Sequence, residues 1–246
     1  MHPAFPSALL FLRILGGPEV EPVSGHRYLL LEPAPWPESE QAAQVLGGHL
    51  ASIGSPEEQR WVFSTFGNRG GVERSLWIGL SRSTLGGSFS WSDGSVTTYR
   101  NWLPGQPDDA LGGEPYVHPI SRTNGFGHPG GTWNDLRTPG APFTDFDPVC
   151  GVVELPPLEL RFDAAPTAGS PGFSCPTLPG FLYRIERTDD LVTGEWVDAG
   201  VSVLGDGLPW VTELPAAAAE ARSYRVVETA PATSVSSVVH LGSQGR

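Results

Sequence analysis

Carboxylates are the most abundant side chains in this sequence that could do chemistry. The chain carries 27 Asp and Glu against 15 Lys and Arg, which gives a formal net charge of −12. Residues 101–111 and 121–146 are rich in turn-forming residues, and long irregular loops in a compact domain are often functional. Carboxylate and amide oxygens are the ligands that a hard cation such as calcium requires. We therefore look for a cation site in these two stretches, although an acid excess can also serve solubility alone.

The sequence offers no set of residues for catalysis. It has no nucleophile with a neighbouring base and orienting group, no phosphate-binding loop and no His-rich cluster. The two cysteines, Cys150 and Cys175, lie in no Cys-x-x-Cys or Cys/His pattern, so zinc is not predicted. They could form one disulfide or remain two thiols, and the sequence does not decide between these states. We therefore do not expect an enzyme.

Charge and hydropathy exclude two further classes of partner. A strongly negative surface repels phosphate backbones and no basic stripe offsets it, so nucleic acid is not an expected partner. The apolar run at residues 8–15 is short, contains Arg13 and lacks a preceding positive region. No signal peptide is therefore evident, and no stretch is apolar enough to predict membrane insertion.

The elements that must position a site begin with two predicted helices. The first opens in the proline-rich segment 33–37 and stops at Gly47-Gly48. The second begins at Ser55-Pro56-Glu57-Glu58, a capping box with proline at the first helical position. Short apolar segments predict strands at 28–31, 76–80, 88–91 and 151–155. This part of the chain is expected to be α+β.

The later part of the chain reads as a small all-β domain. Segments 181–187, 195–197 and 223–227 alternate between apolar and polar residues, as strands with one solvated face do. Thirty-one Gly and 25 Pro also favour turns and short strands over long helices. The predicted organisation is a lead-in at 1–24, an α+β domain at 25–156, an all-β domain at 157–229 and a tail at 230–246.

Seven short motifs occur in the α+β domain in the order found in C-type lectins. Any one of them would be weak evidence, but the ordered series resembles that family over about 130 residues, roughly half of the chain. The resemblance implies two helices, small antiparallel sheets and a long loop region. The motifs are Leu46–Ile53, Trp77–Leu80, Trp91–Gly94, Asn101-Trp102, Gln106–Asp108, Trp133–Asp135 and Gly151–Leu155.

The match departs from the family at its disulfides. Ala43 and Val153 stand where one cysteine pair is found, and Tyr116 and Thr138 stand at the other. In this respect the domain is similar to the cysteine-poor bacterial branch of the family. The all-β region likewise resembles a small β-module that is appended to secreted bacterial proteins.

The resemblance implies a calcium site that also binds sugar. In sugar-binding members the ligands are the first and third residues of Glu-Pro-Asn or Gln-Pro-Asp, a Glu six positions later, and the Asn and Asp of Trp-Asn-Asp. The order Gln then Asp goes with galactose-type sugars, and a cis peptide before Pro107 is implied. The matching positions, for both metal and sugar, are Gln106, Asp108, Glu114, Asn134 and Asp135.

Two departures limit what the resemblance implies. The family's auxiliary calcium site is not expected, because Arg82 and Gly86 occupy its acidic positions, although Asp109 remains. Relatives stack an aromatic residue on galactose where this chain has Ala110, so weak galactose binding is expected unless Phe126 replaces that ring.

The expected function is therefore calcium-dependent glycan binding by a secreted or cell-surface protein. Calcium is the expected cofactor and a glycan or glycoconjugate the expected partner. The alternative is a non-catalytic protein-binding or structural module that contacts other extracellular proteins. A calcium-independent interaction surface would distinguish this alternative.

Overall fold

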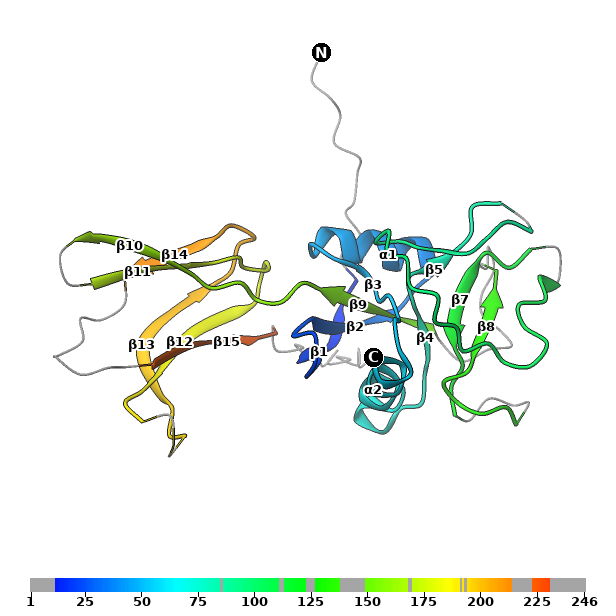
Figure 1. Cartoon of the computed structure of the whole chain (residues 1–246), viewed down its shortest axis with the longest axis horizontal. Coiled ribbons are helices and arrows are strands. Elements are labelled where there is room, and N and C mark those ends of the chain that lie inside the picture. The colour runs from blue at the N-terminus through cyan, green and yellow to red at the C-terminus, as the bar shows by residue number, and fades with distance from the viewer. Residues whose placement is uncertain are drawn as a thin grey trace, which may run out of the picture.

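The computed structural model separates the chain into two groups of elements. One group contains both α-helices and strands β1–β9, and the other contains strands β10–β15 (Figure 1). This arrangement confirms the predicted α+β fold and shows the additional β region after it. The structure describes residues 12–84, 86–110, 113–122, 127–137, 149–167, 170–190, 192, 194–213 and 223–230.

The first sheet brings together strands from both ends of the α+β region. Its order is β1-β2-β9-β3, all antiparallel, and β4 pairs with β9 in parallel. Residues 28–31 of β2 are buried, as the apolar run predicts. Strand β1 falls within residues 1–24, so part of the predicted lead-in belongs to this sheet. The bounds are β1 Ile14–Val20, β2 Arg27–Pro33, β3 His49–Leu50, β4 Ser75–Trp77 and β9 Val149–Leu155.

Both predicted helices form. Helix α1 spans Trp36–Val45, and helix α2 spans Pro56–Phe66, followed by a short 3-10 turn at Arg69–Gly71. The Ser55 hydroxyl accepts a hydrogen bond from the Glu58 backbone N–H at 3.1 Å, which confirms the predicted N-cap. The Glu58 carboxylate accepts from the N–H of the residue before Ser55, instead of completing a reciprocal capping box.

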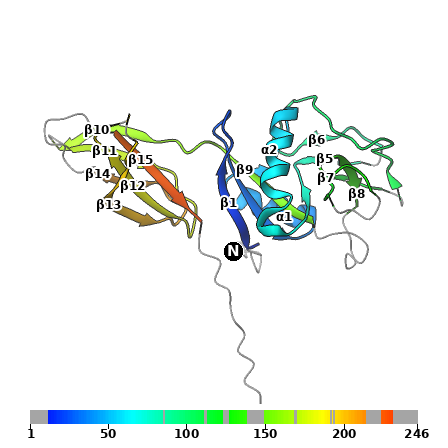
Figure 2. The ribbon, with the colours of Figure 1, turned by 90° about the horizontal axis from the view of Figure 1, so that it is seen from below.

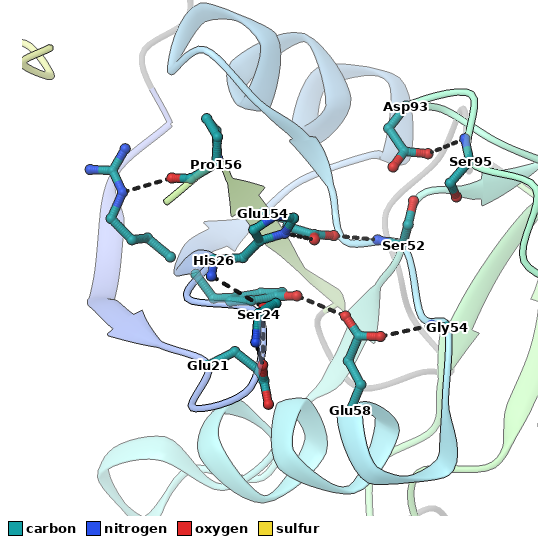
Figure 3. Close-up of polar contacts among 12 residues, drawn as sticks. Glu21, Ser24, His26, Ser52, Gly54, Glu58, Asp93, Ser95, Glu154 and Pro156 are labelled. Atoms are coloured by element: carbon teal, nitrogen blue, oxygen red, sulfur yellow. Dashed lines mark hydrogen bonds and ion pairs between the residues drawn. The ribbon is translucent and has the colours of Figure 1, made fainter. Parts of the chain in front are cut away.

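Polar contacts hold the start of α2 against the first sheet. Glu154 of β9 accepts the Ser52 N–H at 2.9 Å and contacts the His26 ring nitrogen at 2.5 Å. Figure 3 shows these residues together. The Tyr28 hydroxyl of β2 donates to Glu58 at 2.8 Å. The helix, two strands and the loop before the helix are therefore fixed together by side chains distant in sequence.

A second sheet carries the candidate site. Its order is β6-β5-β7-β8, with bounds β5 Leu80–Ser81, β6 Ser90–Trp91, β7 Tyr116–Pro119 and β8 Trp133–Leu136. Strand β8 lies within the stretch 121–146 that was expected to be irregular. It is a strand because all four of its residues pair with β7, an arrangement that local sequence does not reveal.

The apolar segment 76–80 divides between the two sheets. It was expected to be one strand, but Trp77 pairs in the first sheet and Leu80 pairs in the second. The chain passes between the sheets at Gly79, where a Cβ atom would lie only 2.4 Å from the Leu50 carbonyl oxygen. The absence of a side chain at this position therefore lets the two sheets approach each other.

Trp133 is the centre of the packing beneath the site. It is fully buried, and its indole N–H donates to the Gln59 side-chain oxygen of α2 at 2.7 Å. The rings of Trp91, Tyr99 and Trp102 meet it edge to face at 5.7–5.9 Å between centroids. This packing fixes the start of β8 and therefore the backbone of the two residues that follow Trp133.

Apolar packing occupies one of the two positions where the family has disulfides. Ala43 and Val153 are both fully buried in one hydrophobic cluster. At the other position, Tyr116 stacks on Trp36 at 4.7 Å, and Thr138 lies outside the described residues. Cys150 and Cys175 are free thiols, and burial raises the pKa of each to about 11.

The second part consists of two three-stranded sheets. Figure 2 shows the chain leaving β9 as an extended segment and entering β10. The alternating segments 181–187 and 223–227 form strands, whereas the segment at 195–197 begins its strand only at Val197. The sheets are β10-β11-β14 and β13-β12-β15, with bounds Arg161–Thr167, Ser170–Cys175, Trp210–Glu213, Val197–Leu204, Leu182–Thr188 and Ser223–Thr229 in that order.

A buried ion pair joins β2 to β15. The Arg27 guanidinium donates to both carboxylate oxygens of Glu228, at 2.6 and 2.7 Å, and to the Pro156 carbonyl at 3.0 Å. The Tyr183 hydroxyl also donates to Glu228, at 2.5 Å. The Arg27 and Glu228 side chains are only 7% and 5% exposed, so the ion pair is largely shielded from solvent.

Candidate functional site

Three carboxylates meet where the loop after residue 105 approaches strand β8. One oxygen each from Asp108, Glu114 and Asp135 lie within 4.8 Å of one another. Glu114 and Asp135 are buried, whereas Asp108 is exposed. The structure therefore brings together three of the five predicted ligands, from two segments that are distant in sequence, with one side open to solvent.

Asp135 anchors the loop from β8. Its side chain is 0% exposed. One of its oxygens accepts the Asp108 N–H and the other accepts the Asp109 N–H, each at 3.1 Å. These two bonds place the loop backbone against the strand and point the Asp135 carboxylate at the predicted ligand segment.

Short-range hydrogen bonds shape the loop itself. The Gln106 side-chain oxygen accepts the Asp108 N–H at 3.0 Å, so it lies beside the three carboxylates. Ala110 N–H donates to Glu114 at 2.9 Å and to Asp108 at 3.2 Å. The peptide between Gln106 and Pro107 is cis, as the resemblance implied. The predicted loop ligands thus converge on one small volume.

Asn134 is held by a residue whose role was not predicted. Its side-chain N–H group donates to the Asp135 carbonyl at 2.5 Å and lies 3.3 Å from the His118 Nε2 atom of β7. Burial lowers the pKa of His118 to about 4, so the ring is neutral at pH 7 and can accept from the amide. The local sequence does not reveal this role of His118, because the role depends on the cross-strand pairing of His118 with Asn134.

The surroundings of the buried carboxyl groups Glu114 and Asp135 raise their pKa values and so favour the uncharged form. Burial, and then the neighbouring charge of Asp135, raise the pKa of Glu114 to about 7, and Asp108 adds to this effect. Burial also raises the pKa of Asp135, opposed by the N–H groups of Asp108 and Asp109 and by the Arg82 charge. A bound cation would relieve this repulsion, and a donor set made only of oxygen atoms fits calcium.

Arg82 is the second residue that sequence analysis missed. It was noted only as a basic residue at a position where relatives are acidic. In the structure its Nη2 atom lies 2.6 Å from an Asp109 oxygen and 3.3 Å from an Asp135 oxygen. It is therefore a charged partner of the site and not simply a lost ligand.

The residues expected to contact the sugar ring are less well defined. Ala110 is half-buried and offers no aromatic surface beside Asp108. Phe126, the alternative stacking residue, lies outside the described residues.

Comparison with known proteins agrees with the fold and the motifs. Residues 32–135 match the family model described as Lectin C-type domain, a segment that contains every predicted ligand. The chain contains a C-type lectin domain. C-type lectin domains are non-catalytic carbohydrate-binding modules, which agrees with the expectation that this chain is not an enzyme. Two resemblances stay predictions. One is that of this domain to the bacterial branch of the family, and the other is that of the β region to a secreted module.

Individual relatives match less than half of the chain. The versican core proteins of Rattus norvegicus and Bos taurus are each 39% identical over 102 residues, which is 41% of this chain and 3% of each relative. The chain thus spans a small fraction of these relatives. Among the described residues, no helix combines the length and apolar character needed to cross a membrane.

Solved C-type lectin structures align with a larger share of the chain. The cow CD23 carbohydrate-recognition domain is 30% identical, covering 57% of this chain and 91% of that one, with a TM-score of 0.41. The mouse scavenger receptor C-type lectin domain is 27% identical, covering 59% and 96%, with a TM-score of 0.43.

Proposed function

We propose that the C-type lectin domain binds one calcium ion and recognises glycans through it. The observation that carries this proposal is the convergence of Asp108, Glu114 and Asp135 within 4.8 Å. Three carboxylates held this closely need a compensating charge, and one side of the cluster faces solvent. The full ligand set is Gln106, Asp108, Glu114, Asn134 and Asp135.

The bound ion would supply coordination positions for two vicinal sugar hydroxyls. The protein's own groups complete the recognition. Asp108 and Glu114 accept hydrogen bonds from the hydroxyls, while the amide of Gln106 donates to a hydroxyl oxygen. The His118 ring contacts the Asn134 amide and positions it. Asp135 holds the loop in place by accepting the Asp108 N–H.

The proposed sugar class is galactose-like, with weak affinity. The order Gln106 then Asp108 matches the galactose type, but Ala110 supplies no ring to stack on the sugar. An open site of this kind binds one sugar with a dissociation constant of about 1 mM, or about −4 kcal/mol. Useful avidity then requires several copies acting together. The matched relatives support a proposed secreted or cell-surface location.

A glycan array read with calcium and with chelator tests this function. The full chain is expected to bind a set of glycans in calcium and to lose them all in chelator. Asp108→Asn removes one ligand charge and should abolish binding, whereas Asp93→Asn, on an exposed turn, should not. Glycan binding that persists in chelator would contradict the proposal and favour a calcium-independent surface.

A further inference from the structure

Arg82 places a positive charge inside the site. Its side chain is only 6% exposed, and its Nη2 atom faces three oxygens. These are the Asp109 carboxylate at 2.6 Å, the Asp135 carboxylate at 3.3 Å and the Glu114 backbone carbonyl at 3.2 Å. One nitrogen therefore has the oxygen-rich surroundings that a small cation would have.

The remaining contacts of Arg82 hold the guanidinium in this place. Arg82 directly follows strand β5, and its backbone N–H donates to the Pro115 carbonyl at 2.9 Å. The guanidinium lies over the Phe89 ring, 4.6 Å from the ring centroid. Its Nε atom is buried with no hydrogen-bond partner among the described residues, so the group is positioned through Nη2 and the ring.

The three oxygens belong to the two segments that form the site. Asp109 and Glu114 lie on the loop, and Asp135 lies on β8. Asp109 has a φ of 55°, a left-handed conformation that is costly for a residue with a side chain. Its N–H bond to Asp135 and its ion pair with Arg82 together hold this conformation.

We propose that Arg82 is a built-in cation that keeps residues 106–110 and 113–114 close to β8 when no metal ion is bound. Without it, Asp108, Asp109, Glu114 and Asp135 would repel one another and push the loop away from the strand. The site is then preformed, and an incoming ion meets ligands already in place. This last consequence rests on the proposed calcium function, whereas the effect of Arg82 on the loop does not.

Hydrogen exchange of the full chain in chelator tests the role of Arg82. Arg82→Met should speed exchange of the Asp108, Asp109, Ala110 and Glu114 amides by at least about tenfold, because buried carboxylates lose their charged partner. The Ala51 and Trp133 amides, bonded to Val152 and Asn101, should change little. This confinement to the loop separates a positioning role from a general loss of stability.

Two control variants define the cause. Arg60→Gln makes the same change in net charge on a side chain that is 73% exposed, and it should leave loop exchange as in the natural chain. Arg82→Lys keeps the charge and should recover most of the protection. If Arg82→Met does not fold, Asp109→Asn removes the nearest partner at a half-buried position and should open the same amides.

Adding calcium separates this inference from the proposed function. In Arg82→Met, calcium should restore protection to the loop, whereas in the natural chain it should add little. If calcium has no effect on either form, the calcium function fails while the loop result still stands. Equal loop exchange in chelator for Arg82→Met, Asp109→Asn and the natural chain would overturn the role of Arg82.

Discussion

Two regions of the molecule contain buried carboxylates, and they differ in whether positive charge balances the negative charge. On β12, Glu186 bonds to Arg225 and Arg184, and these hydrogen bonds lower the pKa of its carboxyl group. In the lectin loop, burial and neighbouring carboxylates raise the pKa of Glu114 to about 7. In the first region, the charge of Glu186 is balanced by the two arginines without any ligand. The second has one arginine for four carboxylates, which is the condition expected of a cation site.

The junction between the two parts extends this comparison to a buried ion pair. Arg27→Met should lower the free energy of unfolding by about 3–5 kcal/mol, because Glu228 would remain buried without its partner. Denaturant unfolding of the full chain measures this. Arg161→Gln is the control, since its pair with Glu159 is largely exposed and should contribute almost nothing. A loss for Arg27→Met no larger than for the control would show that the junction is not important for stability.

Calcium affinity should depend on pH through Glu114. Calcium needs the ionised carboxylate, and a pKa of about 7 means that affinity falls about tenfold for each pH unit below 7 and levels off above it. Calorimetry at pH 5, 6, 7 and 8 measures this. If calcium affinity were the same at all four pH values, protons would not be competing with calcium for these carboxylates.

Without calcium, the stability of the folded chain should depend on pH in the opposite direction. Stability should fall as the pH rises, whereas calcium affinity rises. Because folding raises the Glu114 pKa from 4.5, the folded state holds this proton more tightly than the unfolded state. That contribution is fully present below about pH 4.5 and is lost as the pH rises through 7. Thermal melts in chelator should therefore show a stability loss between pH 5 and 8 that is smaller in Glu114→Gln. An unchanged loss in that variant would assign the effect to other groups.

The smallest expected effect concerns the sugar. Ala110→Trp should strengthen galactose binding by about 1 kcal/mol, the scale of a favourable ring contact, and should leave calcium affinity nearly unchanged. Galactose titrations of both forms in excess calcium measure it. Tight binding by the natural chain, or no gain in the variant, would mean that another residue supplies the stacking surface.

Local sequence predicted the elements that depend on local chemistry. The Ser55 cap, both helices and strands β2, β9, β12 and β15 follow from capping residues and apolar patterns, and the structure contains them. The ordered motifs also led to the loop and to β8, where three of the predicted ligands converge. These features are encoded within short stretches of chain.

What local sequence did not predict depends on contacts between distant strands. The pairing of His118 with Asn134 and the reach of Arg82 to Asp135 each join segments that only the second sheet brings together. The division of 76–80 between two sheets and the formation of β8 have the same origin. The domain bounds at 156–157 stay a prediction, since one apolar cluster includes Val153 as well as Phe173 from the second part.

A calorimetric calcium titration of the full chain tests the central claim most directly. We expect one site per chain, with a dissociation constant of about 0.1–1 mM, typical of extracellular modules. Asp108→Ala should abolish the binding, because the remaining ligands cannot complete the shell, and Asp93→Asn should keep it. Absence of calcium binding by the natural chain, or unchanged binding by Asp108→Ala, would contradict the account.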